Sequence, residues 1–341
     1  MATLKGKSVR TTPKPVLEDW INLPEEIHKK HKRIELCMDI MYINGVGLMT
    51  AVDRSIRYRS IVEITSNNND EALLSALDLI IQKYVKADYF VAVVYCDREF
   101  KSIIQDVYNR LDVVINCTNT NDHVAEAERN NRFLKERFRT AFHLLPYKAI
   151  PRIMIKSLAF EITKQANYFP VKDGVSSILS PRQLIDRKSL DYNRDFRIPF
   201  GSYVQASVAT NNTPKARTRS SIYLGQPDNI QGGHLVMSLE TGQELSTQRV
   251  TVIPITDLVI KRVEEIAHNQ NFKTLKFKNC KGQVYHDESL IAGVDSEANQ
   301  NQNANENADN TENAKKEEMD NDNNSNHAVE TITSTSLDDT Q

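Results

Sequence analysis

The sequence of 341 residues predicts an α/β fold: a mixed five-stranded sheet with helices on both faces, followed by a small β-barrel and a disordered tail. Three observations predict it. Segments in which apolar and polar residues alternate, as in strands, come first. After them, helix-like and strand-like segments follow each other in turn. Residues 89–96 form a wholly apolar run too short for a helix, which is typical of a strand buried on both faces. Beyond residue 294 there are no aromatic side chains and 11 asparagines, a composition that cannot bury enough apolar surface to fold.

The predicted sheet begins with three strands in a meander. Apolar and polar residues alternate over residues 34–43, and Asn44-Gly45 is the residue pair preferred in a tight hairpin turn. Residues 46–52 then return as the second strand. Alternation resumes over residues 56–64, which we expect to form the third strand.

Helices and strands alternate in the next hundred residues. A stripe of apolar residues from Leu73 to Tyr84 predicts the first helix. We expect strands at 89–96 and 112–117, and helices at 100–111, 123–145 and 150–168. Pro146 ends the second of these helices, and the third begins through Pro151. This order of elements is that of the ribonuclease-H-like fold. Since strand–helix–strand crossovers are right-handed, the fourth and fifth strands should run parallel to the first.

The chain is therefore predicted to divide into five parts. Residues 1–30 are basic and without periodicity, as in an extended arm, and residues 31–170 form the ribonuclease-H-like core. Residues 171–200 are polar and lack periodicity, which favours a linker. Residues 201–268 form a small barrel and a helix, with strands at 201–209, 220–224, 234–239 and 244–255 and the helix at 256–267. Residues 293–341 form the disordered, acidic, asparagine-rich tail.

Charge is distributed unevenly along the chain. Residues 296–341 contain 11 acidic residues and 2 lysines, a net charge of −9, so the preceding 295 residues carry +7 of a total of −2. A basic body favours a polyanionic partner, because lysine and arginine displace counterions from phosphates. No apolar run approaches the roughly 18 residues that span a bilayer. The four cysteines are scattered, which indicates reduced thiols in an intracellular protein.

Three carboxylates are the candidate catalytic groups. Asp39 lies within the first predicted strand, Asp97 follows the fourth, and Glu128 lies near the start of a long helix. The first and fourth strands are neighbours in this fold, so Asp39 and Asp97 should lie side by side. Carboxylate oxygens suit Mg²⁺, a hard cation. A pair of such ions about 3.5–4 Å apart can activate one oxygen and stabilise the leaving oxygen of a phosphodiester.

Each of these carboxylates also has an ordinary structural interpretation. The alternative for Asp39 is a hydrogen-bonded carboxylate within a strand. Asp97 can cap a strand end, with Glu99 as the ligand in its place. Glu128 heads a stripe at helical spacing whose other members are cationic, and this stripe is either a phosphate track or a set of solvated ion pairs. Its cationic members are Arg132, Lys135 and Arg139.

Four segments resemble copia-type (long-terminal-repeat) retrotransposon integrases. Residues 124–136, Val-Ala-Glu-Ala-Glu-Arg-Asn-Asn-Arg-Phe-Leu-Lys-Glu, resemble the helix that carries the third carboxylate. Residues 36–52 are similar to the hairpin of the first carboxylate, and residues 95–100, Tyr-Cys-Asp-Arg-Glu-Phe, to the strand end of the second. Residues 179–205 are similar to the stretch that joins this core to an SH3-like barrel.

The resemblance implies Mg²⁺- or Mn²⁺-dependent DNA strand transfer, with Asp39, Asp97 and Glu128 as metal ligands. It also implies element ends and target DNA as partners, a homo-oligomer to join two ends together, and a nuclear location. The chain departs from the family pattern where Arg98-Glu99 replaces a glycine pair. Two alternatives therefore stay open: a catalytically degenerate, nucleic-acid-binding remnant of a retroelement polyprotein, and a nuclease that cleaves without joining.

Overall fold

The computed structural model describes residues 20–65, 70–118, 124–172, 174–208, 216–227, 232–278 and 283–287. For residues 285–287 it describes the backbone without the side chains. Residues 1–19 of the expected arm and the whole of the expected disordered tail lie outside the described residues. The described end of the arm is not extended, because it contains helix α2 (Glu25–Lys30). Acidic residues in its first turn and basic residues in its last turn match the dipole of the helix.

The main sheet has the strand order and directions expected from the sequence. Strands β3 (Arg59–Glu63), β2 (Val46–Asp53) and β1 (Arg33–Ile43) pair antiparallel, and β4 (Phe90–Cys96) and β5 (Val114–Cys117) follow on the other side. Both β4 and β5 run parallel to β1. The order β3-β2-β1-β4-β5 is the one predicted for a ribonuclease-H-like core.

Two further strands join this sheet, so it has seven strands and not the predicted five. After the second sheet the chain returns as β11 (Lys276–Lys278), which pairs with the end of β1 at Tyr42 and Ile43, and β12 (Val284–Asp287) pairs with β11. The reason lies in the lengths of the strands. β4 pairs with β1 only between Arg33 and Cys37, and β11 occupies part of the edge left open beyond it.

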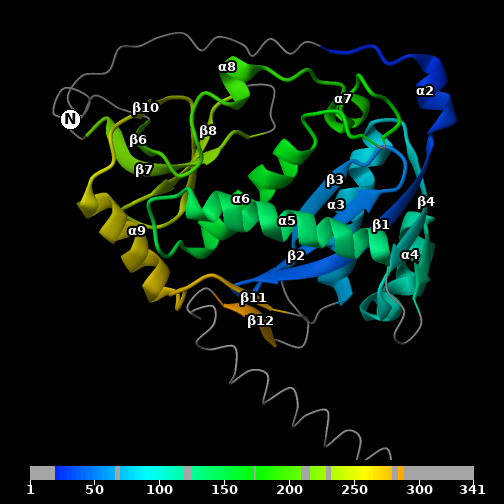
Figure 1. Ribbon diagram of the computed structural model, residues 1–341, viewed down its shortest axis with the longest axis horizontal. Helices are drawn as coiled ribbons and strands as arrows, with labels where there is room; N and C mark the ends of the chain where they lie inside the picture. The colour runs from blue at the N-terminus through cyan, green and yellow to red at the C-terminus, as the bar shows by residue number, and fades with distance from the viewer. Residues whose placement is uncertain are drawn as a thin grey trace, which may run out of the picture. The chain divides into compact units, whose positions relative to one another are not determined.

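Helices cover both faces of the sheet, as predicted (Figure 1). Side chains alternate along β1, so Leu36 and Met38 pack on one face and Met41 and Ile43 on the other. The first face is covered by α3 and α4, together with the short 3₁₀ helix η1, and the second by α5 and α6. The bounds of these helices are Asp70–Lys86 for α3, Arg98–Ile103 for η1, Ile104–Leu111 for α4, Ala125–His143 for α5 and Arg152–Ala166 for α6.

The region expected to be a barrel contains a five-stranded antiparallel sheet of order β10-β6-β7-β8-β9. The last predicted strand, 244–255, is interrupted and forms both β9 and β10. Within the described residues no pairing joins β9 to β10, so the structure shows an antiparallel sheet and not a closed barrel. The strands are β6 (Tyr203–Ser207), β7 (Thr218–Gly225), β8 (His234–Ser238), β9 (Glu244–Thr247) and β10 (Val250–Val252), and helix α9 (Asp257–Asn269) comes after them.

The two sheets share one hydrophobic core. Phe138 of α5, Ile222 of β7, Met237 of β8 and Val263 of α9 belong to a single cluster of buried side chains, which Phe277 of β11 completes. The described residues between 20 and 287 accordingly belong to one compact unit. The predicted core and barrel are therefore parts of one body, because each buries the apolar face of the other.

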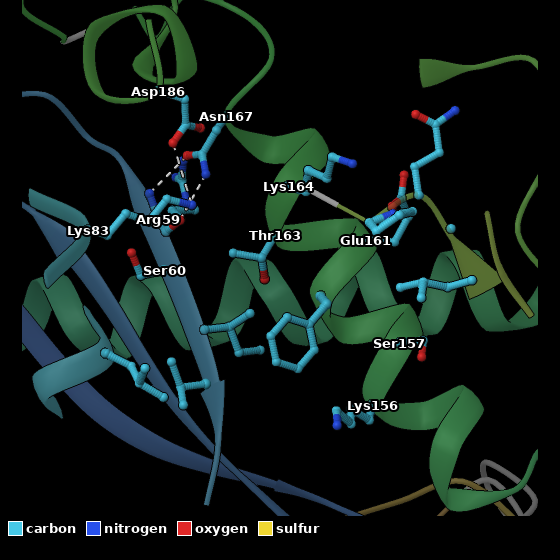
Figure 2. Close-up of a pocket in the computed structure, with 18 of the residues that line it drawn as sticks. Arg59, Ser60, Lys83, Lys156, Ser157, Glu161, Thr163, Lys164, Asn167 and Asp186 are labelled. Atoms are coloured by element: carbon cyan, nitrogen blue, oxygen red, sulfur yellow. Dashed lines mark hydrogen bonds and ion pairs between the residues drawn. The ribbon is translucent and has the colours of Figure 1, made fainter. Parts of the chain in front are cut away.

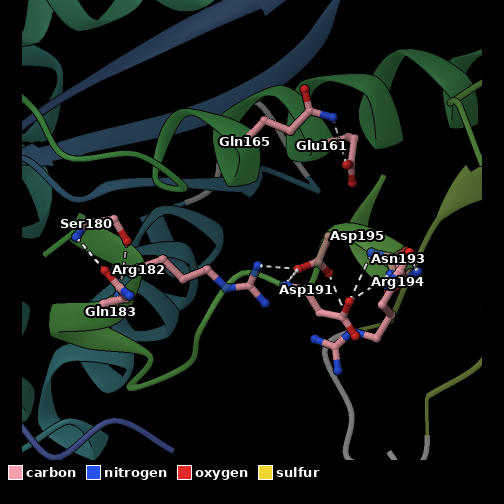
Figure 3. Close-up of polar contacts among 10 residues, drawn as sticks. Glu161, Gln165, Ser180, Arg182, Gln183, Asp191, Asn193, Arg194 and Asp195 are labelled. Carbon is pink, nitrogen blue, oxygen red and sulfur yellow. Dashed lines mark hydrogen bonds and ion pairs between the residues drawn. The ribbon is translucent and has the colours of Figure 1, made fainter. Parts of the chain in front are cut away.

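Residues 171–200 are folded and do not form the expected linker. They contain α7 (Pro181–Ile185) and α8 (Tyr192–Asp195), and Ser180 begins α7 with a capping box. Arg182 and Asp195 form a buried ion pair, Nη1 to Oδ2, of 3.0 Å (Figure 3). Helices of four or five residues are too short to show a helical period in the sequence, and for this reason the pattern suggested a linker.

Candidate active site

The structure brings Asp39 and Asp97 to the same level of two neighbouring parallel strands. Cys37 of β1 is opposite Tyr95 of β4, and each aspartate lies two residues further along its strand. The backbone of Asp97 is still extended, with φ −76° and ψ 170°, so both aspartates share the face of Cys37 and Tyr95. Those two side chains pack against Ala127 in the first turn of α5. The aspartates therefore lie on the face of the sheet that α5 covers.

Asp39 is held by a hydrogen bond from α5. The side-chain amide of Asn131 donates from Nδ2 to Asp39 Oδ2 over 2.6 Å, and the backbone N–H of Ile40 donates to Asp39 Oδ1 over 2.7 Å. Asn131 Oδ1 in turn accepts from the Thr50 hydroxyl over 2.6 Å, and this hydroxyl also lies 3.2 Å from the carbonyl oxygen of Asp39. Asn131 and Thr50 are 3% and 1% exposed, so the bond between them is shielded from water, whereas Asp39 is partly exposed.

Sequence reasoning did not assign a role to Asn131 or Thr50. The available signal was the pair Asn130-Asn131 on the side of α5 that packs on the sheet. A buried amide needs a hydrogen-bond partner, and such a pair in an otherwise apolar stripe indicates polar groups opposite it.

Burial, together with the negative charges of Asp97 and Glu99, raises the pKa of Asp39 to about 6. The hydrogen bond from Ile40 and the positive charge of Lys135 act in the opposite direction but do not outweigh the burial. Lys135 itself is partly buried, and burial lowers its pKa although Asp39 favours its charged form. A carboxyl group that loses its proton only near neutrality, with other carboxylates close by, is a place where a cation would be stabilising.

Glu128 lies on α5 one turn before Asn131, and its side chain is exposed. A nearby carboxylate on the same helix, Glu126, has a different environment: its Oε1 lies 3.5 Å from Nε of Arg54. Arg54 also contacts Glu35, at 3.4 Å, and stacks over Tyr95. Glu126 is thus part of an ion-pair group, while Glu128 lies on the same flank of α5 as Lys135.

The predicted phosphate-binding stripe is only partly on the surface. Arg132 and Arg139 are exposed, as expected of residues that contact a polyanion, whereas Lys135 is partly buried beside Asp39. The position of Lys135 suits a role in balancing the charge of the carboxylates. The roles of Arg132 and Arg139 stay a prediction.

The described residues do not contain a ready-made metal centre. No three His, Cys, Asp or Glu side chains in this part of the chain are grouped so as to hold a metal ion, and both oxygens of Asp39 accept hydrogen bonds. The chemistry of the donors nevertheless suits a divalent cation, since carboxylate oxygens on two adjacent strands are ligands that Mg²⁺ prefers. Binding would require Asp39 to give up its proton and the Glu128 side chain to turn toward the sheet.

A cavity of about 380 Å³ lies away from the three carboxylates (Figure 2). Its walls are formed by the outer edge of β3, by α3 and α6, and by the end of β7. At one end Asn167 closes the edge of β3, because its side-chain amide exchanges two hydrogen bonds of 2.8 Å with the backbone of Arg59. Asp39, Asp97 and Glu128 do not line this cavity.

No protein-family model matches this chain, and no curated protein matches its sequence. Among solved structures, the chain is similar to the catalytic core domain of BIV integrase, with 14% sequence identity and a TM-score of 0.33. The match covers 44% of this chain and 92% of that domain. None of the helices in the described part of the chain combines the length and apolar character needed to cross a bilayer.

Proposed function

We propose that this chain is an integrase-type polynucleotidyl transferase that joins DNA ends to target DNA with the help of divalent cations. One observation carries the proposal: Asp39, within β1, and Asp97, directly after β4, lie at the same level of two adjacent parallel strands, on the face covered by the helix that carries Glu128. The order of strands and helices is the one that we expect of this class of enzyme.

In this proposal Asp39 and Asp97, with Glu128, hold Mg²⁺ or Mn²⁺. When bound, the metal activates an oxygen nucleophile and stabilises the leaving oxygen of the phosphodiester. Asn131 fixes the orientation of the Asp39 carboxylate, and Lys135 compensates negative charge next to it. Arg132 and Arg139, on the exposed part of the same helix, bind the backbone of the DNA. Joining two ends to one target requires at least two copies of the chain, and chromosomal DNA as target implies a nuclear location.

A test is the joining of a pre-trimmed duplex end to target DNA with Mg²⁺ or Mn²⁺. We expect the wild-type chain to join, and Asp39→Asn, Asp97→Asn and Glu128→Gln to lose joining while they still bind DNA. Glu136→Gln is the matched control, because Glu136 is an exposed carboxylate two turns further along α5. Its joining should equal that of the wild type.

One observation favours the degenerate remnant as a second candidate. Both oxygens of Asp39 are engaged by hydrogen-bond donors, and the described residues hold no preformed metal centre. This candidate predicts DNA binding without turnover in the same assay, with no stabilisation by Mg²⁺ or Mn²⁺. Cleavage without joining would instead identify a nuclease.

A further inference from the structure

Three arginines lie together on the side of α5 that faces away from the carboxylates. Arg59 of β3 stacks on Phe133 with its guanidinium carbon 4.4 Å from the ring centre, and Arg137 stacks on the same ring at 5.3 Å. Phe133 and Arg137 lie about 140° and 180° around the helix from Glu128, at 100° per residue. Arg57, two residues before Arg59, lies close enough for its positive charge to act on Arg59.

No carboxylate among the described residues lies within ion-pair distance of any of these three arginines. Burial lowers the pKa of Arg59, and the positive charges of Arg57 and Arg137 lower it further. Of the five N–H donors of Arg59, the one on Nε is accounted for, since it donates to Oδ1 of Asn130 over 3.1 Å. A partly buried cation next to two others is unfavourable unless an anion compensates it.

A second observation points to the same missing partner. Asn130 is 4% exposed, and its Nδ2 has no hydrogen-bond partner among the described residues. This amide is the one that holds Arg59, so the unpartnered donor lies beside the guanidinium. Buried donors without a partner are rare in folded proteins. The group therefore offers hydrogen-bond donors from Arg57, Arg59, Arg137 and Asn130. These donors are complementary to a ligand whose atoms only accept hydrogen bonds.

We propose that Arg57, Arg59, Arg137 and the amide of Asn130 form a phosphate-binding site. The planar guanidinium group presents paired N–H donors that match the oxygens of a phosphate. The phosphate comes either from the backbone of a nucleic acid or from the free anion. The site is separate from the three carboxylates and does not depend on the proposed catalytic activity.

The experiment uses the full chain in EDTA, so that catalysis plays no part. The test variant is Arg57→Asn/Arg137→Gln. Arg57 has φ +63°, a conformation that asparagine tolerates, and Arg137 is exposed, so neither change should harm the fold. Lys86→Gln/Arg110→Gln is the matched control, with the same loss of charge on exposed side chains of α3 and α4.

The first arm measures Tm in inorganic phosphate and in chloride of equal ionic strength. We expect phosphate to raise the Tm of the wild type and of the control, and not that of the test variant. Without phosphate and at low salt, the test variant should melt at the same temperature as the wild type or higher, since mutual repulsion of the arginines is removed. A purely structural role of the arginines would lower it.

The second arm measures binding of two unrelated DNA duplexes as a function of salt. If the site binds the nucleic-acid backbone, the test variant binds both duplexes more weakly, and its slope of log K against log salt is smaller by about 1. A response in the phosphate arm alone assigns the site to the free anion. An equal response of wild type and test variant in both arms overturns the proposal.

Discussion

Asn131 of α5 donates a 2.6 Å hydrogen bond to the carboxylate of Asp39 on β1 and so connects the central strand to the helix that carries Glu128. A second bond of 2.6 Å, from the hydroxyl of Thr50 on β2, fixes the orientation of the same amide. Two strands of one hairpin and a helix distant in the sequence therefore position one carboxylate. The candidate active site depends on this network as much as on the three acidic residues.

Removal of either partner of this network should destabilise the chain. Asn131→Ala and Thr50→Val each leave a buried polar group without a partner, which costs about 1–3 kcal/mol in the free energy of unfolding. Because the two residues share one bond, the double variant should lose about 1 kcal/mol less than the sum of the single changes. Urea denaturation measures all three. Strictly additive losses would show that the bond contributes nothing.

Stability in EDTA should fall as the pH rises from about 4 to about 6. The pKa of Asp39 is about 6 in the folded chain, against an ordinary value of 3.8, so the folded state binds the proton more tightly than the unfolded state does. The stabilisation from this proton is present at low pH and is lost through pH 6. Asp53, whose pKa burial also raises to about 6, acts in the same direction.

Asp39→Asn isolates the contribution of Asp39. Relative to the wild type, this variant should gain on the order of 2–3 kcal/mol in the free energy of unfolding between pH 4 and pH 7. Urea denaturation at a series of pH values measures the gain. Asp106→Asn, at an exposed position of α4, is the control and should leave the curve unchanged. Parallel curves for wild type and Asp39→Asn would contradict the raised pKa.

The ion pair between Arg182 and Asp195 should be essential for the fold of residues 171–200. The two side chains are 4% and 0% exposed, and breaking a buried pair leaves a buried charge without compensation. Arg182→Met or Asp195→Leu alone should cost about 3–5 kcal/mol. The double variant should be less destabilised than either single variant, because it removes both buried charges of the pair; Arg194, which lies 3.5 Å from Asp195, loses that contact in the double variant and in Asp195→Leu alike. Thermal unfolding tests whether the double variant has a higher Tm than each single variant. Equal Tm values for all three would argue against a structural role for the pair.

Gly201, at the entry to the second sheet, should tolerate substitution less well than Gly45. Both have a positive φ, +81° and +78°, so alanine strains the backbone at either position, by about 1 kcal/mol. At Gly201 the added methyl group would also lie 2.7 Å from Cδ2 of Leu145, whereas at Gly45 it meets no atom within 4 Å. Gly201→Ala should therefore have the lower Tm, and the difference measures the packing between the two sheets. Equal losses would mean that Leu145 moves away without cost.

The sequence was a good guide to the main sheet and to the strands and helix between residues 201 and 268, and a poor guide to residues 171–200 and to β11. Alternation in 34–43 and the apolar run 89–96 are local patterns, and both predicted strands are present. The capped helix α7 and the strand β11 contain five and three residues, fewer than a period needs to become visible. Both depend on partners more than a hundred residues away in the chain. The hydroxyl of Tyr58 bonds to Asp186 at the end of α7, and Ile43 of β1 pairs with β11.

The same division applies to the candidate site. Asp39 and Asp97 were selected from their places on two predicted strands, and the register of β1 and β4 puts them at one level. Glu128 was selected from helical spacing and the motif. The structure adds that Glu126 is engaged by Arg54, a residue that spacing along α5 cannot reveal.

By itself, the sequence determined the layers of the molecule: which segments are strands and helices, and which of their faces are apolar, because periodicity is a local property of the chain. Only the tertiary structure decided that two predicted domains share one core, that Asn131 and Thr50 orient Asp39, and that three arginines gather on the far side of α5. These features depend on side chains brought together from distant segments, where burial sets the strength of each hydrogen bond and charge.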